Sequence, residues 1–565
     1  MKKHILILSA SILLLSGCND LDLFPLSEAS KETWFADETE MKMAVNNIFH
    51  KSFWSSYAPW EGYYHTDDFQ WRQYASWGQD GTLAADNSHI KNTWGASYMC
   101  IARANAVLEN YEKALEIIPE NKLNIYAANA KFARATMYSK LIFHWGDVPY
   151  YEGTIDIDQA FSMGRTNKSE ILQKIYADYD YAIANLPTNY SSSESQLATK
   201  GAALAFKARI ALYMGDFAIA RDAAKGCIDL GVYQLFPDYY TLFIPSTKNS
   251  IESIFVEPFS LDFASYWDPK EWLPRSLGGT CSKNPSWELF CSYLCTDGLP
   301  IDESPLFNPR EPFKNRDPRC AATIVEFDTN WLGLQFSPHP DSLYVLNHNT
   351  GKLILNNDTR TNTQWASFNA MIWRKRIDET SLSLRSDNDN IIMRFADVLL
   401  MYAEAKIELG EIDQTVLDAM NKVRARAYGV DISQTSSYPE ITTTNQNELR
   451  KLLRIERRME FAEENIIRYN DIIRWRLAEK VLNIPRYGIL DPAELREKVV
   501  KPGLWFFPET PSIDEDGVVD FKPMYDKGLI KIIMVRNFDP SKHYLWPIPT
   551  SEVVINENLG QNPGY

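Results

Sequence analysis

The stretch "KGAALAFKARIALYMGDFAIARDAAKGCIDLG", Lys200 to Gly231, decides the fold class. Small and apolar residues recur at spacings of three and four from Ala203 to Tyr213, and again from Phe217 to Leu230. This spacing is typical of helices that bury one face, and Gly215-Asp216 between the two runs predicts a tight turn. The stretch therefore predicts a helical hairpin.

The same pattern recurs along the chain. It is clear in "FADVLLMYAEAKIELGEIDQTVLDAMNKVRARA", where Gly410 marks the turn, and looser from Trp94 to Pro119 and from Asn124 to Tyr151. A further helix is expected from Ser169 to Pro187. These hairpins resemble tetratricopeptide repeats, which stack into scaffolds. The predicted fold class is mainly α, with tetratricopeptide-like hairpins that support an irregular, loop-rich half with short strands.

The segment from about residue 236 to 389 differs from the hairpins, being rich in Pro, Gly, Asn and aromatic residues. Loops this long in an ordered fold usually carry function. The expected organisation is a signal peptide (1–17), a tether (18–30), a helical region (31–235), an irregular region (236–390), helical repeats (391–485) and an irregular strap (486–565). Residues 31–565 are expected to form one composite domain.

The N-terminus has the order of a secretory signal. Lys2 and Lys3 precede an apolar run from Ile5 to Leu15, and "LSGC" ends at Cys18. The run is too short to span a bilayer as a helix. It resembles a bacterial lipobox, in which cleavage before Cys18 leaves a thiol that carries lipid. A plain signal peptide with an incidental cysteine is the alternative.

Composition limits the partners and the chemistry. The formal net charge of −16 argues against nucleic acid bound through a broad basic face. No nucleotide loop, HExxH or GxSxG motif is present, so neither catalytic residues nor a cofactor are predicted. The "RSDNDN" run could hold Ca²⁺, although a solvated turn is favoured. The other cysteines are expected to be isolated buried thiols: Cys100, Cys227, Cys281, Cys291, Cys295 and Cys320.

Six motifs in order carry a resemblance to a known family. They are "NDLDLFP" after the lipobox, "ELFCSYLCTDGLPI", "RDPR", "IIMRFADVLLMYAEAKIELG", "LRKLLRIERRMEFAEENIIRYNDIIRW" and the closing "YLWPIPTSEVVINENLGQNPGY". Nearly end to end, the chain resembles the SusD/RagB family of surface glycan-binding lipoproteins. The resemblance implies binding of oligo- or polysaccharide without turnover, a lipid anchor in the outer membrane facing outward, and a SusC-like TonB-dependent transporter as partner.

One departure and one ambiguity accompany the resemblance. The family usually has Gly where this chain has Glu464, which puts a turn there in doubt. The dense charge of the same region could suggest acid/base chemistry, but pairing between packed helices is the preferred interpretation. The residues concerned are Glu456, Arg457, Arg458, Glu460, Arg474 and Arg476.

Glycan recognition needs exposed aromatic rings beside polar side chains, and two regions qualify. In "YYHTDDFQWRQYASWGQDG" the spacing of three predicts a helical turn that places three aromatic residues on one face, with polar groups nearby: Trp71, Tyr74, Trp77, Asp67, Asp68 and Arg72. "SYWDPKEWLPRS" adds Tyr266, Trp267 and Trp272, with Arg275 nearby. Trp365 is an outside candidate.

The remaining tryptophans in helical contexts and in the closing segment are expected to pack in the core: Trp34, Trp54, Trp94, Trp145, Trp475 and Trp546. Two alternatives to glycan capture stay open. A protein-binding scaffold would use the same hairpins, and a glycoside hydrolase would need a carboxylate pair that a sequence alone cannot show.

Overall fold

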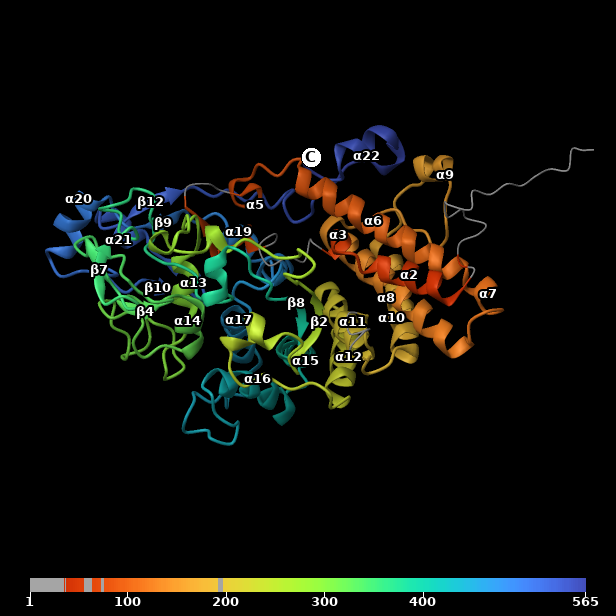
Figure 1. Ribbon diagram of the computed structural model, residues 1–565, viewed down its shortest axis with the longest axis horizontal. Helices are drawn as coiled ribbons and strands as arrows, with labels where there is room; N and C mark the ends of the chain where they lie inside the picture. Colours follow the sequence, from red (N-terminus) through yellow and green to blue (C-terminus); the bar gives the residue numbers. More distant parts are fainter. Residues whose placement is uncertain (1–34, 36, 55–62, 73–75, 192–196) are drawn as a thin grey trace, which may run out of the picture.

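The computed structural model describes residues 35, 37–54, 63–72, 76–191 and 197–565. The long helices of the first part gather at the right of Figure 1. They are α2 (Glu38–Ile48), α6 (Ser88–Glu109), α8 (Glu120–Trp145), α10 (Lys168–Asn185), α11 (Lys200–Met214) and α12 (Phe217–Asp229), with the short α3 (Lys51–Trp54) after α2. Cys18, the signal and tether segments and Trp34 lie outside the described residues.

The α11–α12 hairpin forms as the sequence predicts. Thr199 caps the start of α11, because its hydroxyl accepts a hydrogen bond from the Ala202 amide at 3.1 Å. Gly215 ends the helix with a φ of 84°, a left-handed conformation that glycine adopts without steric cost. The α15 (Phe395–Leu409) and α16 (Gln414–Ala427) pair repeats this geometry, with Gly410 at a φ of 72°. The next long helix is α17 (Gln446–Glu460).

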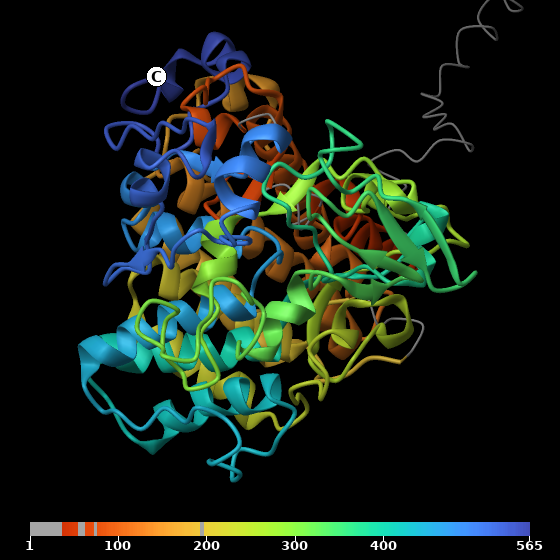
Figure 2. The same cartoon turned by 90° about the vertical axis from the view of Figure 1, so that its left-hand side faces the viewer.

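The other part of the molecule holds short strands and loops, at the left of Figure 1. Strands β1 (Phe69–Trp71) and β3 (Lys283–Pro285) pair antiparallel. Strands β2 (Ser253–Glu257) and β8 (Asn390–Arg394) also pair antiparallel, near the middle of Figure 1 beside α11. A four-stranded sheet, green in Figure 2, comprises β4 (Thr329–Trp331), β5 (Leu334–Phe336), β6 (Tyr344–Asn347) and β7 (Lys352–Leu355). The fold is mainly α with a loop-rich half, which confirms the predicted class.

Shorter elements complete the fold. The strands are β9 (Arg486–Gly488) paired with β12 (Lys531–Met534), and β10 (Ser512–Ile513) paired with β11 (Val519–Asp520). The short helices are α5 (Trp77–Asp80), α7 (Tyr111–Ala114), α9 (Ile157–Ser162), α13 (Trp287–Ser292), α14 (Pro318–Thr323), α18 (Ile467–Arg474), α19 (Ala478–Val481), α20 (Pro492–Leu495), α21 (Lys522–Asp526) and α22 (Thr550–Ile555).

The closing segment lies against the end of α8. The Trp546 amide donates to the His144 carbonyl at 2.7 Å, and the Trp145 indole donates to the Pro547 carbonyl at 2.8 Å. The His144 and Trp546 rings stack 4.2 Å apart. Trp546 is buried, as are Trp54, Trp94 and Trp145, so these are core residues as predicted; Trp475 is half-buried.

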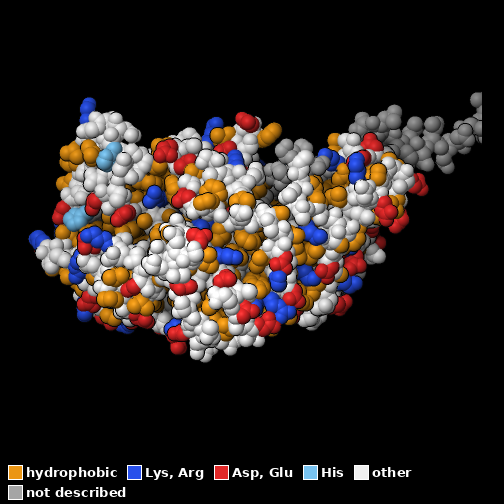
Figure 3. Space-filling view, turned by 90° about the horizontal axis from the view of Figure 1, so that it is seen from below, with side chains coloured by type: hydrophobic (Ala, Val, Ile, Leu, Met, Phe, Trp, Pro, Cys, Tyr) orange, Lys and Arg blue, Asp and Glu red, His pale blue; other side chains and the backbone are white. Residues whose placement is uncertain are grey.

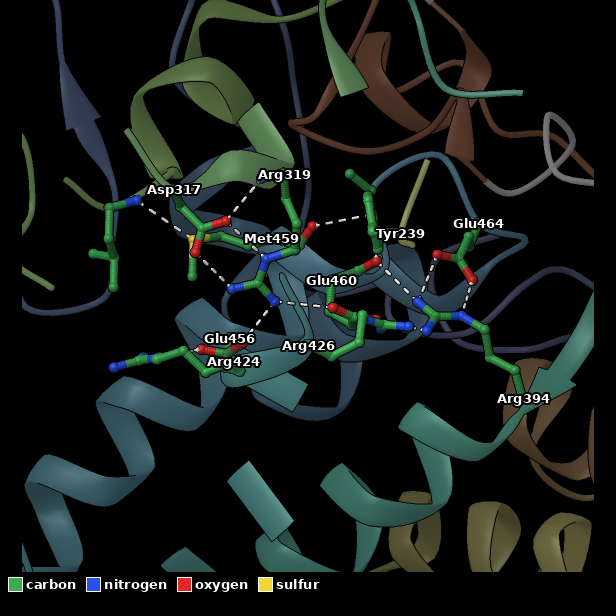
Figure 4. A network of polar contacts seen from close by, with 12 residues as sticks. Tyr239, Asp317, Arg319, Arg394, Arg424, Arg426, Glu456, Met459, Glu460 and Glu464 are labelled. Atoms are coloured by element: carbon green, nitrogen blue, oxygen red, sulfur yellow. Dashed lines mark hydrogen bonds and ion pairs between the residues drawn. The ribbon is translucent and has the colours of Figure 1, made fainter. Parts of the chain in front are cut away.

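A buried network of arginine and carboxylate side chains joins the helical and loop-rich parts (Figure 4). Glu460 on α17 accepts from Arg319, Arg394 and Arg426, which come from three other segments. Burial alone would raise the pKa of Glu460, but Arg426, Arg394 and Arg319 hold it well below its usual range. The charges therefore pair between packed elements, as the sequence interpretation preferred.

The chain turns after α17 although it has Glu464 where the family usually has glycine. Helix α17 ends at Glu460, and Glu463 and Asn465 take left-handed φ values of 60° and 48°. The Glu464 carboxylate pairs with Arg394 at 2.7 Å and with Lys375 at 2.6 Å. Ion pairing thus holds in place a backbone that would be strained on its own.

The six cysteines after Cys18 are all free and buried, which confirms the prediction of isolated thiols. Within the described ranges, no helix is both long and apolar enough to cross a membrane. Acidic and basic side chains are interspersed on the face seen in Figure 3, where no broad basic area gathers.

Candidate functional site

Asp67 and Asp68 are interior residues, which corrects the prediction that they lie beside a sugar. Asp67 accepts from Arg458 and Arg468 at 2.9 and 2.7 Å, and Asp68 accepts from Arg458 at 2.6 Å. Both carboxylates are almost completely buried. Burial raises the pKa of Asp68, whereas at Asp67 the two arginines outweigh burial and lower the pKa. These side chains fasten the segment before β1 to α17 and α18.

Trp71 lies in a strand, so the predicted helical turn is wrong at this position. It is the last residue of β1, and its pairing partner on β3 is Lys283. Strand pairing with a segment distant in sequence overrides the spacing of three that suggested a helix. Tyr74 and the side chain of Trp77 lie outside the described residues.

Lys283 lies among three aromatic rings next to β1. Its ammonium nitrogen is 4.4 Å from the ring centre of Trp272, 4.5 Å from that of Tyr64 and 5.4 Å from that of Trp71. Glu271 pairs with the same nitrogen at 2.8 Å. Cation–π contacts of this kind fix the orientation of the rings. Trp71 is therefore held half-buried at the β1 edge.

Trp267 and Trp272 are buried, which corrects the prediction that they are stacking platforms. Each exposes only 6% of its surface. Their rings meet edge to face at 5.2 Å, and the Trp272 indole donates to Glu463 at 2.6 Å. Both rings pack beneath the surface that Trp71 borders. Tyr266, their neighbour in sequence, is 38% exposed, with the Arg385 guanidinium 5.3 Å from its ring centre.

Arg72 links the loops that surround β1. Its Nη1 donates to the Thr280 carbonyl at 2.6 Å and to the Trp365 carbonyl at 2.5 Å, and its guanidinium lies 5.2 Å from the centre of the Trp365 ring. Arg275 donates to the same Thr280 carbonyl at 3.4 Å. Trp365 keeps 39% of its surface exposed. Three segments thus bring to one region an exposed indole, two guanidinium groups and the half-buried Trp71, which is the neighbour of Arg72 in sequence.

We call this region the β1-loop surface and define it as Tyr64, Trp71, Arg72, Arg275 and Trp365. Asp358 stabilises it from below, because its buried carboxylate accepts the backbone amides of Arg275 and Ser276 at 2.7 and 3.3 Å. Burial raises the pKa of Asp358 despite these hydrogen bonds. Of the predicted residues, the structure brings Trp71 and Arg72 to this surface, and the outside candidate Trp365 joins them.

Sequence reasoning missed one strongly exposed aromatic residue. Phe263 is 87% exposed at the tip of a hairpin that the Ser260–Ser265 backbone bridge closes. Ala264 beside it has a φ of 51°. The stretch "SLDFASYW" offers a turn signal in its Ser and Asp residues, and an aromatic residue at such a tip could have been singled out.

The described residues form no cluster of three or more His, Cys, Asp or Glu side chains that could hold a metal ion. The acidic side chains of "RSDNDN" face different partners. Asp387 pairs with Lys248 at 2.7 Å, and Asp389 accepts the Phe259 amide at 3.0 Å. Their carboxylates are therefore engaged separately rather than gathered around a cation.

Comparison with known proteins agrees with this architecture. The SusD family model matches residues 250–565, and a model described as "Starch-binding associating with outer membrane" matches residues 26–212. SusD-like protein P25 of Formosa agariphila is 27% identical over 75% of this chain and 79% of its own length. SusD-like protein P2 of the same organism is 24% identical over the full length of both chains.

A solved structure shares both fold and sequence. The crystal structure of a SusD-like carbohydrate binding protein from Bacteroides fragilis superposes with a TM-score of 0.75 at 27% identity, covering 93% of this chain and all of that one. The family match spans more than half of the sequence. The chain belongs to the SusD family.

Proposed function

We propose that this protein captures an oligo- or polysaccharide on the β1-loop surface. The observation that carries the proposal is the indole of Trp365, partly exposed and held in place by Arg72. An exposed indole provides a flat apolar face for the C–H groups of a sugar ring, and neighbouring arginines supply directional donors for its oxygen atoms. The similar Bacteroides fragilis structure is described as a carbohydrate binding protein.

We propose further that binding occurs without cleavage. Glycoside hydrolysis needs two carboxyl groups that flank one glycosidic bond and are available to the substrate. Two carboxylates that adjoin the β1-loop surface have other partners: Glu271 pairs with Lys283, and Asp358 accepts backbone amides. Their engagement favours a protein that binds and releases its glycan unchanged.

The proposed cellular role rests on the family and on the N-terminal sequence. We propose that lipid on Cys18 anchors the protein at the outer face of the outer membrane, and that it delivers glycan to a SusC-like TonB-dependent transporter. The family description "Starch-binding associating with outer membrane" supports this location. The lipobox-like "LSGC" supports the anchor.

Isothermal titration against a panel of polysaccharides tests the proposal. Trp365→Ala is expected to weaken binding at least tenfold, because it removes the stacking face. Tyr344→Ala is the control for the loss of an exposed aromatic ring, since Tyr344 is 60% exposed on the four-stranded sheet. Equal affinity for both variants would remove the β1-loop surface as the site. Release of shorter sugars would instead indicate a hydrolase, and tight binding of a protein but no glycan would indicate a scaffold.

A further inference from the structure

Three histidines gather beneath the closing segment, residues 544–565. His144 stacks on Trp546 with 4.2 Å between the ring centres, and His89 meets the same indole edge to face at 5.7 Å. The ring of His65 lies 6.3 Å from that of His89. The three histidines come from α8, from α6 and from the segment before β1. Elements distant in sequence thus meet beside one tryptophan of the closing segment.

This histidine cluster is also the place where the closing segment is fastened. The Trp546 amide donates to the His144 carbonyl at 2.7 Å, and the Trp546 indole donates to the Tyr469 hydroxyl at 2.9 Å. The Thr550 amide donates to the Ala85 carbonyl, just before α6, at 2.9 Å. The end of the chain accordingly lies beside the start of α6 in Figure 1. Separation of the clustered rings therefore frees the segment from α8 and exposes its attachment to α6.

The surroundings of the cluster keep its histidines neutral. Burial, together with Lys140 on the same helix and His89 on α6, lowers the pKa of His144 to about 3. Burial and His89 hold the pKa of His65 well below its usual range. Tyr469 on α18 faces both rings, and burial raises the pKa of its hydroxyl to about 12. These described neighbours are neutral or positively charged, so they offer no counter-charge to a proton added to the cluster.

The histidine that directly precedes the closing segment has different surroundings. Burial and Lys542 lower the pKa of His543, whereas Asp539 and Asp80 raise it. The Nδ1 atom of His543 also accepts the Asp539 amide at 2.8 Å. Because two carboxylates favour its charged form, His543 is not a member of the cluster.

We propose that His65, His89 and His144 form a pH-sensitive latch, which holds the closing segment at neutral pH and releases it in acid. Release exposes the rings to water, where a histidine takes up a proton with a pKa of about 6.5. The folded pKa values of His65 and His144 lie below this value. The stability that the neutral rings provide is therefore fully present above about pH 6.5 and is lost as the pH falls toward the folded values.

The latch is connected to the β1-loop surface through His65. Its Nδ1 atom lies 2.8 Å from the Ser76 hydroxyl, which donates to the Tyr64 carbonyl at 2.9 Å. Tyr64 belongs to the β1-loop surface, so opening of the cluster also loosens that surface. Glycan is therefore expected to bind less tightly in acid, an expectation that rests on the proposed function.

Hydrogen exchange tests the latch without any glycan. The protection factor of residues 544–553 corrects for the effect of pH on exchange itself. Each histidine that opening exposes should lower this factor about twentyfold between pH 7 and pH 5. His144→Phe keeps an aromatic ring against Trp546 but takes up no proton, so it should retain that share of the protection at pH 5. His348→Gln is the control, because His348 is exposed between β6 and β7, and it should behave as the wild type.

A protection factor that stays constant in the wild type from pH 7 to pH 5 overturns the latch. An equal fall in the wild type, in His144→Phe and in His89→Gln overturns it as well, because another group then opens the segment. His89→Gln changes a half-buried residue and keeps the test open if circular dichroism shows that His144→Phe does not fold. A fall that either variant reduces supports the latch.

Glycan titration at the same two pH values examines the connection to the β1-loop surface separately. Weaker binding at pH 5, restored by His144→Phe, supports the connection. Unchanged affinity in a protein whose closing segment loses protection overturns the connection. If no glycan binds at either pH, the proposed function fails, whereas the latch is still decided by hydrogen exchange.

Discussion

Arg72 lies over the indole of Trp365, with its guanidinium 5.2 Å from the ring centre, while its Nη1 donates to the backbone carbonyl of the same residue at 2.5 Å. One side chain thus holds both the ring and the backbone of the exposed tryptophan. Because Arg72 also donates to Thr280, it joins the loop that contains Trp365 to the loop before β3.

Replacing Arg72 should therefore weaken glycan binding even if Arg72 never contacts the sugar. We expect Arg72→Ala to lose about 1 kcal/mol of binding free energy, because the Trp365 ring loses its support. Arg72→Lys should recover only part of the loss, since an ammonium group cannot stack its plane on the Trp365 ring as a guanidinium group does. Titration of both variants with the glycan that binds the wild type measures this. If Arg72→Ala binds the glycan as tightly as the wild type, the loop holds Trp365 in place without Arg72.

Asp67→Asn should act on stability rather than on binding. It leaves Arg458 and Arg468 short of a buried counter-charge, and breaking such a pair typically costs about 3–5 kcal/mol. Urea unfolding should show this loss, while the folded fraction binds glycan with unchanged affinity. Glu38→Gln is the control, because the exposed pair of Glu38 with Lys122 should contribute less than about 1 kcal/mol. If Asp67→Asn lowers the affinity for glycan but leaves the free energy of unfolding unchanged, Asp67 takes part in glycan binding after all.

The sequence predicts the helical hairpins well because their signals are local. Gly215 and Gly410 mark turns whose left-handed geometry requires nothing from the rest of the chain. The local spacing of three predicts a helical turn at Trp71, whereas the residue lies in a strand whose partner, Lys283, is far away in sequence. The burial of Asp67 cannot be predicted from its neighbours in sequence either, because its partners Arg458 and Arg468 lie far along the chain. Local spacing cannot show long-range pairing.

The candidate site was predicted only in part for a related reason. Aromatic residues beside polar groups are common to a platform and to a packed interior, and only the tertiary structure separates Trp365, which is exposed, from Trp267 and Trp272, which are not. At Glu464 the sequence suggests a difference from the family that the fold does not show. A residue that departs from the family pattern is accommodated because Arg394 and Lys375 pair with its carboxylate.

The anchor prediction can be tested on Cys18 directly. In a host that processes bacterial lipoproteins, the wild-type protein should incorporate labelled palmitate and sediment with membranes. Cys18→Ala should do neither, because no thiol remains to carry the lipid. Cys227→Ala, which alters a buried cysteine, is the matched control. Labelling of Cys18→Ala would place the lipid elsewhere.

Chelation should leave glycan binding unchanged. The carboxylates of the "RSDNDN" run, the candidate for a calcium site, each have a protein partner: Lys248 for Asp387 and the Phe259 amide for Asp389. We therefore expect equal affinity and equal melting temperature before and after dialysis against EDTA. A drop in melting temperature that Ca²⁺ restores would show a calcium site after all.

Glu463 should make the stability of the protein depend on pH. Burial raises its pKa to about 8, and the nearby Arg376 and Lys375 offset this only in part. Because the folded pKa lies above that of an exposed glutamate, the proton bound by Glu463 stabilises the fold fully below about pH 4.5, and that contribution is lost as the pH rises through 8.

Glu463→Gln should remove this dependence, because glutamine stays neutral and its amide oxygen can still accept the Trp272 indole. We expect the free energy of unfolding of the variant to match that of the wild type near pH 5 and to exceed it by on the order of 3 kcal/mol at pH 9. Lys375 and the other titrating groups are common to both proteins, so the difference between the two urea-unfolding curves isolates Glu463. Parallel curves from pH 5 to 9 would mean that Glu463 is already charged in the folded protein, with Arg376 as its counter-charge.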